Sequence, residues 1–214
     1  MRLVLPKLYV ILDAALAATP VPELADQLYS SGVRLFQYRN KNAPAREVLQ
    51  TAKEIAERVV SRDAKFFVND RPDIAALAGA SGVHLGQEDL SPEDGRAVLG
   101  LNRLLGISTH NRAQFEAAIA TSADYVAIGP IFETESKVNP DPVVGTALLK
   151  ELRPLTEKPI VAIGGITLER AGEVIQAGAD SAAVISDILR ANDPVVRASQ
   201  FLEALQNTRT RSAN

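Results

Sequence analysis

The chain has 214 residues, 46% hydrophobic and 23% charged, a composition typical of a globular protein with a packed core. Its net charge of −3, without a block of lysine or arginine, makes nucleic acid a poor partner. The absence of cysteine excludes disulfides and zinc–thiolate sites, and two histidines leave little for a nitrogen-rich metal site, so oxygen would hold any metal.

The N-terminal stretch "MRLVLPKLYVILDAALAAT" has some features of a secretory signal, namely early positive charges and an apolar run. Asp13 interrupts that run, and the same residues are needed as a first strand. No apolar run approaches the roughly 20 residues that a membrane-spanning helix needs. We therefore expect a cytoplasmic protein with no membrane partner.

Short apolar runs recur along the whole chain and predict strands. There are eight such runs: "LYVIL" (8–12), "RLFQYR" (34–39), "KFFVN" (65–69), "GVHLG" (82–86), "LLGIS" (104–108), "YVAIG" (125–129), "IVAIG" (160–164) and "SAAVIS" (181–186).

The segments between these runs have helical spacing, most clearly "REVLQTAKEIAERVV" (46–60). Capping side chains indicate where four of the helices begin. These caps are Ser91, Asn111, Thr167 and Asp193, and glycines in "YSSGV" and "QAGAD" indicate two helix ends.

Strands that alternate with helices predict a parallel sheet, and eight such units match a single-domain (β/α)₈ TIM barrel. We expect this barrel to occupy residues 1–206, followed by a disordered tail at 207–214. An open doubly wound sheet is the alternative fold, although no G-x-G-x-x-G motif follows the first strand.

Polar or glycine-rich residues follow the predicted strands, where loops of a TIM barrel carry its chemistry. After the last two strands, Gly164 and Gly165 allow close approach to a ligand oxygen, and the backbone N–H groups of Ile185 and Ser186 can complete a phosphate cradle. The alternative is that these glycines only form a tight turn.

A second anion site is indicated by cations that follow different strands, together with two carboxylates. The cations are Arg39, Lys41 and Lys137, and the carboxylates are Asp70 and Asp89. Carboxylates among cations suit Mg²⁺, which takes one or two of them and the phosphate oxygens of a substrate. Taken singly, Asp70 could cap a helix, Asp89 could form a turn, and Arg39 could pair with an acid.

The two histidines have no spacing typical of a metal site. His84 is expected to point into the barrel as a hydrogen-bonded core residue, and His110 to shape the start of the fifth helix.

Seven motifs together resemble those of the thiamine-phosphate synthase family, from the first strand to the last. They are "QYRNK", "FVNDRPDIA", "GVHLGQEDL", "GISTHN", "DYVAIGPIFETESK", "VAIGGI" and "GADSAAVIS". The resemblance implies a transferase that joins 4-amino-2-methyl-5-(diphosphooxymethyl)pyrimidine to a thiazole phosphate, or to its carboxylate form, and yields thiamine phosphate and pyrophosphate.

The resemblance also implies residue roles. The pyrimidine diphosphate would contact Gln37, Arg39, Lys41, Asn69, Ser108 and Lys137; the thiazole phosphate would contact Thr134, Ser136, Gly165, Ile185 and Ser186; and Mg²⁺ would be bound by Asp70 and Asp89. Of these, Arg39, Lys41, Ser108 and Lys137 would be catalytic. Glu133 and Glu135 are expected to point outward into solvent.

The family mechanism is dissociative, so the main task is to stabilise charge on the departing pyrophosphate. Two alternatives remain open. One is a thiazole tautomerase on the same barrel, which needs a proton shuttle, and the other is a non-catalytic barrel that senses phosphate or thiamine. The substrates are the expected partners, and the sequence leaves homo-oligomerisation open.

Overall fold

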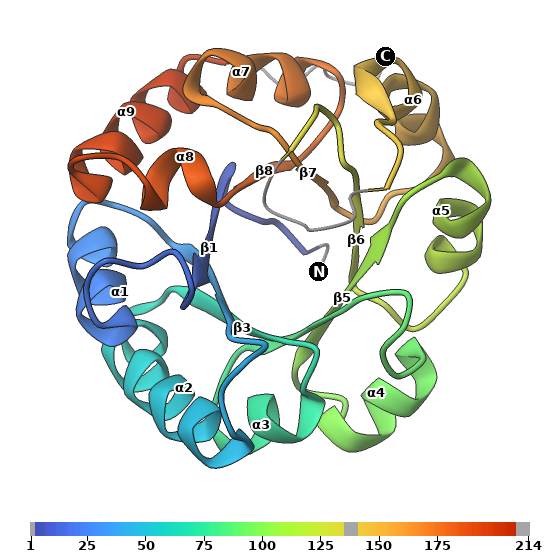
Figure 1. Ribbon diagram of the computed structural model, residues 1–214. Coiled ribbons are helices and arrows are strands. Elements are labelled where there is room, and N and C mark those ends of the chain that lie inside the picture. Colours follow the sequence, from blue (N-terminus) through green and yellow to red (C-terminus); the bar gives the residue numbers. More distant parts are fainter. Residues whose placement is uncertain (1–2, 135–140, 209–214) are drawn as a thin grey trace.

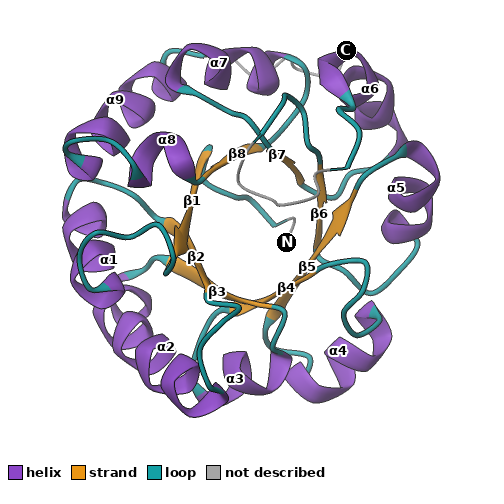
Figure 2. Ribbon diagram, viewed as in Figure 1, coloured by secondary structure: helices purple, strands orange, loops and turns teal. Residues whose placement is uncertain are grey.

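The computed structural model describes residues 3–134 and 141–208 of the chain. Its strands form one closed parallel barrel in the order of the sequence, and β1 pairs with β8 to complete the ring (Figures 1 and 2). The strands are β1 (Leu8–Asp13), β2 (Leu35–Arg39), β3 (Lys65–Asn69), β4 (Gly82–Leu85), β5 (Leu104–Thr109), β6 (Tyr125–Ile128), β7 (Ile160–Ile163) and β8 (Ser181–Val184).

Helices surround the strands on the outside of the barrel (Figure 2). They are α1 (Val21–Ser30), α2 (Ala45–Val59), α3 (Pro72–Leu77), α4 (Pro92–Leu99), α5 (Arg112–Ile119), α6 (Gly145–Leu152), α7 (Leu168–Gln176), α8 (Ser186–Leu189) and α9 (Pro194–Gln206), with short 3₁₀ turns η1 (Val60–Arg62) and η2 (Arg153–Leu155). The TIM-barrel prediction is therefore confirmed, and each predicted strand ends within two residues of the observed one.

Alternation along the strands divides the apolar side chains between two cores. In β2, Phe36 and Tyr38 pack outward against the helices, whereas Leu35 packs with the side chains that fill the barrel. Gln37 shares the inward direction with Leu35, as the period of two predicts. This alternation brings the polar side chains of β2 toward the barrel axis.

Three aromatic rings fill the interior of the barrel. The ring centroid of Phe67 lies 5.9 Å from that of Tyr9 and 5.3 Å from that of Tyr125. Glycine on β5 makes room for them, since a Cβ atom on Gly106 would lie 2.0 Å from Cζ of Tyr125. Leu5, before β1, packs against the same cluster. The interior is thus a packed core that can support a pocket above it.

Most of the predicted helix ends are confirmed. The side chains of Ser91, Asn111 and Asp193 accept hydrogen bonds from backbone N–H groups of the helices that they precede. Thr167 also stands at the N-cap position, but its side chain makes no capping bond, so the predicted role of that hydroxyl is wrong. Gly32 and Gly178 have positive φ, as expected after a helix.

Candidate functional site

The carboxyl ends of the strands and the loops that leave them lie together at one rim of the barrel, and the predicted site residues that the structure describes lie at or near this rim. Arg39 is the last residue of β2 and lies beside Asp13, the last residue of β1. The guanidinium of Arg39 forms an ion pair with Oδ2 of Asp13, while Oδ1 of Asp13 accepts a hydrogen bond from the backbone N–H of Ala15 at 2.9 Å. Because Asp13 is buried, this pair holds Arg39 at the rim.

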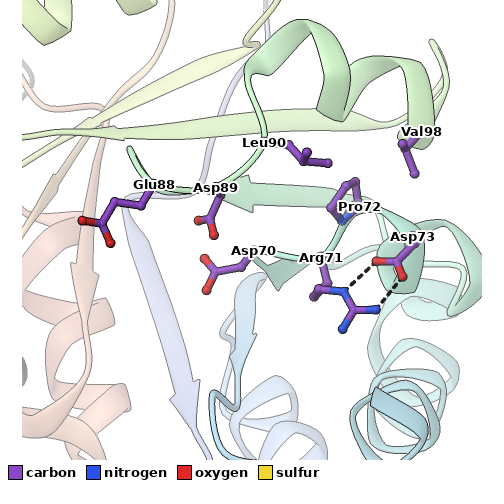
Figure 3. A pocket seen from close by; sticks show the side chains of 8 residues that line it. All are labelled: Asp70, Arg71, Pro72, Asp73, Glu88, Asp89, Leu90 and Val98. Carbon is purple, nitrogen blue, oxygen red and sulfur yellow. Dashed lines mark hydrogen bonds and ion pairs between the residues drawn. The ribbon is translucent and has the colours of Figure 1, made fainter. Parts of the chain in front are cut away.

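Asp70 and Asp89 point toward one another from the loops after β3 and β4 (Figure 3). Burial raises the pKa of Asp70, and the neighbouring carboxylate of Asp89 raises it further. Lys41 opposes this shift with its Nζ atom 3.2 Å from Oδ2 of Asp70. Oδ2 of Asp89 also accepts a hydrogen bond from the backbone N–H of Gly86 at 2.7 Å. The site therefore holds two like charges close together, next to one cation.

The alternative readings of these two aspartates have different outcomes. Asp70 does not cap α3, because Arg71 occupies the N-cap position. Asp70 instead has a φ of 63°, in the left-handed region, where Asp is better tolerated than most residues. Asp89 does belong to the turn before α4, through its bond to Gly86, and its carboxylate still faces Asp70.

A hollow of about 570 Å³ opens beside the carboxylate pair. It lies between the loops after β3 and β4 and the helix α4, and it is lined by Asp70, Arg71, Pro72, Asp73, Glu88, Asp89, Leu90 and Val98 (Figure 3). Arg71 forms an ion pair with Asp73, with their side-chain atoms 2.5 Å apart. Asp70 and Asp89 also line the hollow, and Figure 3 marks no interaction of either one with Arg71.

The floor of the site between β2 and β5 is polar. Gln37 is buried and donates a hydrogen bond from Nε2 to the hydroxyl of Tyr9 at 2.9 Å. Ser108 is half-buried in β5, with its hydroxyl 2.8 Å from Nε2 of His84. Asn69, also half-buried, ends β3 beside His84 in the strand register.

The predicted phosphate cradle lies around the ends of β7 and β8. A small cavity is lined by Thr134, Gly164, Gly165, Ile166, Ala183, Ile185 and Ser186, which unites the predicted residues Thr134, Gly165, Ile185 and Ser186. Gly164 and Gly165 have φ values of 96° and 62°. A Cβ atom on Gly165 would lie 2.2 Å from the carbonyl oxygen of Glu133, so only glycine fits this crowded corner.

Charged side chains support the cradle from outside. Asp187 in α8 accepts a hydrogen bond from the backbone N–H of Leu168 at 3.3 Å and pairs with Arg197 of α9 at 2.9 Å. Arg170 packs over the ring of Phe132, 4.8 Å from its centroid, and donates to the carbonyl oxygen of Gly165. The loops after β6, β7 and β8 are thereby tied to each other.

Two of the predicted contacts, Ser136 and Lys137, lie outside the described residues, as does Glu135. Glu133 is exposed, as expected. Within the described ranges, no group of three or more His, Asp and Glu side chains is placed to hold a metal ion. The predicted ligands Asp70 and Asp89 form a pair of carboxylates.

Both histidines behave as the sequence indicates. His84 is buried, and its burial lowers its pKa to about 4, so its imidazole is neutral near pH 7. His110 precedes α5, where its backbone N–H donates to Gln114, and its Nδ1 lies 2.7 Å from the carbonyl oxygen of Gly129.

Comparison with known proteins agrees with this arrangement. The family model described as thiamine monophosphate synthase matches residues 8–188, from β1 to α8. The chain belongs to the thiamine monophosphate synthase family. A thiamine-phosphate synthase of Koribacter versatilis is 51% identical over 209 residues, which cover 95% of this chain and 97% of the relative. One of Agrobacterium fabrum is 42% identical over 207 residues, 93% of each chain.

A solved structure agrees as well. The thiamine phosphate pyrophosphorylase of Pyrococcus furiosus superimposes with a TM-score of 0.86 at 32% identity, over 94% of this chain and 96% of that protein. As a member of the synthase family, the chain is an enzyme of this kind, a transferase of thiamine biosynthesis, rather than a non-catalytic sensing barrel. Among the helices of the described residues, none is long and apolar enough to cross a membrane.

The sequence analysis missed three residues beneath the synthase site. Asp13, which pairs with Arg39, and Tyr9 both point inward from β1 with the same period of two. Tyr125 begins β6 and contacts His84. The alternation in "YVILD" could have placed Asp13 on the inward face with Tyr9, but no local pattern links β1 to β6.

Proposed function

We propose that this enzyme joins the aminopyrimidine diphosphate to the thiazole phosphate and releases thiamine phosphate and pyrophosphate. With the carboxylate form of the thiazole phosphate, the same coupling would also release carbon dioxide. The observation that supports the proposal is that two separate groups of residues suited to anions lie on one rim. Arg39, Lys41 and the carboxylate pair lie at one of them, and the glycine-rich cradle of β7 and β8 lies at the other. A reaction that brings together a diphosphate and a monophosphate needs such an arrangement.

The pyrimidine half would lie over Gln37, Asn69 and Ser108, with its diphosphate directed toward Arg39 and Lys41. Lys137 is proposed for the same diphosphate on the strength of the sequence motif alone. The thiazole phosphate would lie in the cradle of Thr134, Gly165, Ile185 and Ser186, with Ser136 proposed from the motif.

The chemistry would begin with cleavage of the C–O bond to the diphosphate, while the aminopyrimidine spreads the positive charge. The thiazole nitrogen then forms the new C–N bond. No protein nucleophile is needed. The protein's task is to place fixed positive charges where negative charge grows on the leaving group, and each ~1.4 kcal/mol of such stabilisation is worth tenfold in rate.

We propose Asp70 and Asp89 as the ligands of Mg²⁺. Their fit rests on two carboxylates that face each other and on the raised pKa of Asp70, because a cation between them would relieve the repulsion. Two carboxylates plus phosphate oxygens are a usual Mg²⁺ set. When bound, the ion would neutralise charge on the diphosphate oxygens. A cytoplasmic location and homo-oligomerisation remain predictions.

The decisive experiment mixes the purified protein with both substrates and Mg²⁺ and measures pyrophosphate and thiamine phosphate together. We expect equal amounts of the two products, and little of either in excess chelator. We expect no coupled product when the thiazole phosphate is replaced by the corresponding thiophene phosphate, which lacks the nucleophilic nitrogen. The absence of thiamine phosphate would refute the proposed reaction. Undiminished release in chelator would refute the metal assignment alone. Interconversion of thiazole carboxylate isomers without C–N bond formation would favour the tautomerase alternative.

A further inference from the structure

A chain of hydrogen bonds crosses the barrel interior and connects two of the predicted pyrimidine contacts, Gln37 and Ser108. Gln37 donates from Nε2 to the hydroxyl of Tyr9 at 2.9 Å. The hydroxyl of Tyr9 lies 3.2 Å from that of Tyr125, which lies 2.8 Å from Nδ1 of His84. Nε2 of His84 lies 2.8 Å from the hydroxyl of Ser108. These hydrogen bonds thus join side chains from five different strands.

The middle of this chain is shielded from water. Tyr9, His84 and Tyr125 have exposed fractions of 1%, 6% and 0%. Burial raises the pKa of both tyrosines and lowers that of His84 to about 4. Near neutral pH each phenol therefore keeps its single proton, and the imidazole carries one proton on one of its two nitrogens.

These proton counts fix the direction of every bond. Since Gln37 donates to the hydroxyl of Tyr9, the proton of Tyr9 must go to Tyr125. The proton of Tyr125 then goes to Nδ1 of His84, and the imidazole carries its own proton on Nε2. That proton is donated to Ser108. The opposite direction would leave the buried hydroxyl proton of Tyr9 without an acceptor among the hydrogen bonds of the described residues, which is costly.

We propose that Tyr9, Tyr125 and His84 are positioning residues that set the hydrogen-bonding pattern of the pocket floor. One end of the chain presents an acceptor, Oε1 of Gln37, and the other presents a donor, the hydroxyl proton of Ser108. To turn the acceptor at Gln37 into a donor, the amide of Gln37 would have to rotate and every proton along the hydrogen-bond chain would have to move. Whenever one end of the hydrogen-bond chain presents an acceptor, the other end therefore presents a donor.

The acceptor at Gln37 and the donor at Ser108 favour an aminopyrimidine as the ligand, an inference that rests on the proposed function. An aminopyrimidine offers an N–H donor from its amino group and lone pairs on its ring nitrogens, as the floor requires. In the 4-oxo analogue the donor and acceptor positions are interchanged. A site with fixed polarity rejects such an analogue strongly, because its buried polar groups are left unpaired.

The donor-to-acceptor direction of the hydrogen bonds can be tested without any substrate, by long-range ¹H–¹⁵N correlation NMR of the labelled protein. The protein has two histidines, so a His110→Gln variant assigns the signals of both. We expect His84 as the neutral Nε2–H tautomer from pH 6 to pH 8. His110 should carry a proton on Nδ1, because that atom faces the carbonyl oxygen of Gly129. A His84 proton on Nδ1, or a mixture of tautomers, would overturn the proposed polarity.

The selectivity is tested by calorimetric binding of the aminopyrimidine diphosphate and of its 4-oxo counterpart. We expect Tyr125→Phe to reduce the amino-over-oxo preference at least tenfold, and to raise the KM for the pyrimidine diphosphate without changing the KM for the thiazole phosphate. Tyr9→Phe should have the same two effects, because it breaks the hydrogen-bond chain at its other tyrosine. Two variants keep the test valid if one of them fails to fold.

Tyr38→Phe is the matched control, since Tyr38 is equally buried. Among the described residues its hydroxyl hydrogen-bonds only to Asn40, on the outer side of β2. We expect it to keep the wild-type preference. Unchanged selectivity in Tyr125→Phe and Tyr9→Phe, or an equal loss in Tyr38→Phe, would refute the positioning role. Failure of the wild type to form thiamine phosphate would refute the proposed function instead, while the tautomer of His84 would still decide the polarity.

Discussion

The ammonium group of Lys41 lies 3.2 Å from the carboxylate of Asp70, which also faces the carboxylate of Asp89. Lys41 thus links the two carboxylates to the cations proposed for the diphosphate. It offsets the repulsion between the carboxylates only in part, since burial and Asp89 still raise the pKa of Asp70. Without a bound cation, the ionised pair should therefore destabilise the folded protein.

The first prediction concerns Asp70→Asn. A carboxyl with a raised pKa stabilises the fold while protonated, at low pH, and this contribution is lost as pH rises through the folded-state pKa. Asparagine cannot ionise and tolerates the left-handed backbone at this position. At pH 7.5 without Mg²⁺ we expect urea unfolding to show that the variant is more stable than the wild type.

We expect Mg²⁺ to raise the thermal stability of the wild type, and we expect Asp70→Asn to lose both this stabilisation and most turnover. Asp89→Asn should behave similarly. The control is Asp73→Asn, which breaks the exposed pair with Arg71 in the same hollow and should change little. An Asp70→Asn protein with normal turnover and a normal response to Mg²⁺ would remove Asp70 from the metal site.

The second prediction concerns Asp13→Asn. The amide can still accept the hydrogen bond from Ala15, but the ion pair with Arg39 loses its charge. We expect the rate of pyrophosphate release to fall about 10- to 100-fold, equivalent to about 1.4–2.8 kcal/mol, because Arg39 is then no longer held toward the leaving group.

Asp26→Asn is the control for that variant. It breaks an ion pair of Asp26 with Arg62, 2.5 Å apart, between α1 and η1 on the outer helical layer. Its rate should stay within about twofold of the wild type, since exposed pairs contribute little. Equal rate losses in the two variants would show that Asp13 acts through general stability and not through Arg39.

The sequence predicted the barrel well because each strand carries its own signal. The run "KFFVN" matches β3 at both ends, and the alternation in "QYRNK" placed Gln37 and Arg39 on the inward side. Rim residues such as Asp70 and Asp89 could be grouped for the same reason, because parallel strands of a barrel all end at one face.

The contacts between distant strands could not be predicted in this way. Tyr9 and Tyr125 are 116 residues apart, and their contact depends on the stagger of the strands and on the space that Gly106 leaves. The failed cap at Thr167 has a local origin instead. Residue type identified the N-cap position, but the hydroxyl of Thr167 hydrogen-bonds to the side chain of Glu169 and not to the helix backbone.

The third prediction concerns pH and His84. In the folded protein the pKa of His84 is about 4, below the ordinary value of 6.5 that it has in the unfolded chain. At a pH between these two pKa values the unfolded chain therefore binds more protons than the folded protein. The free energy of unfolding consequently falls as the pH is lowered from 6.5 to 4. The loss between pH 6.5 and pH 4 should be roughly 3 kcal/mol from this group. The imidazole of His84 contacts Tyr125 and Ser108, and the charge of Asp89 favours its protonation.

Urea unfolding at pH 4.5, 5.5 and 7 measures how the free energy of unfolding depends on pH. His84→Gln should be less stable than the wild type at pH 7 but should lose less stability on acidification. Parallel pH profiles for the wild type and His84→Gln would mean that other groups cause the acid sensitivity.

The fourth prediction separates backbone strain from crowding at the cradle. Gly165 and Gly100 both have positive φ, 62° and 84°, so alanine is strained at either position. Only at Gly165 would the new Cβ atom also meet a neighbour, the carbonyl oxygen of Glu133 at 2.2 Å, since Gly100 has nothing within 4 Å. Gly165→Ala must therefore push the loop after β6 away from the cradle.

We expect both variants to lose about 1–2 kcal/mol of stability from strain, because a residue with a side chain is forced into a glycine conformation. Only Gly165→Ala should also raise the KM for the thiazole phosphate, at least tenfold, while binding of the pyrimidine diphosphate stays near the wild-type value. Steady-state kinetics with each substrate varied in turn measures this. An equal rise in both KM values would mean that the loop after β6 serves the two substrates alike, and an unchanged thiazole KM would exclude Gly165 from the phosphate cradle.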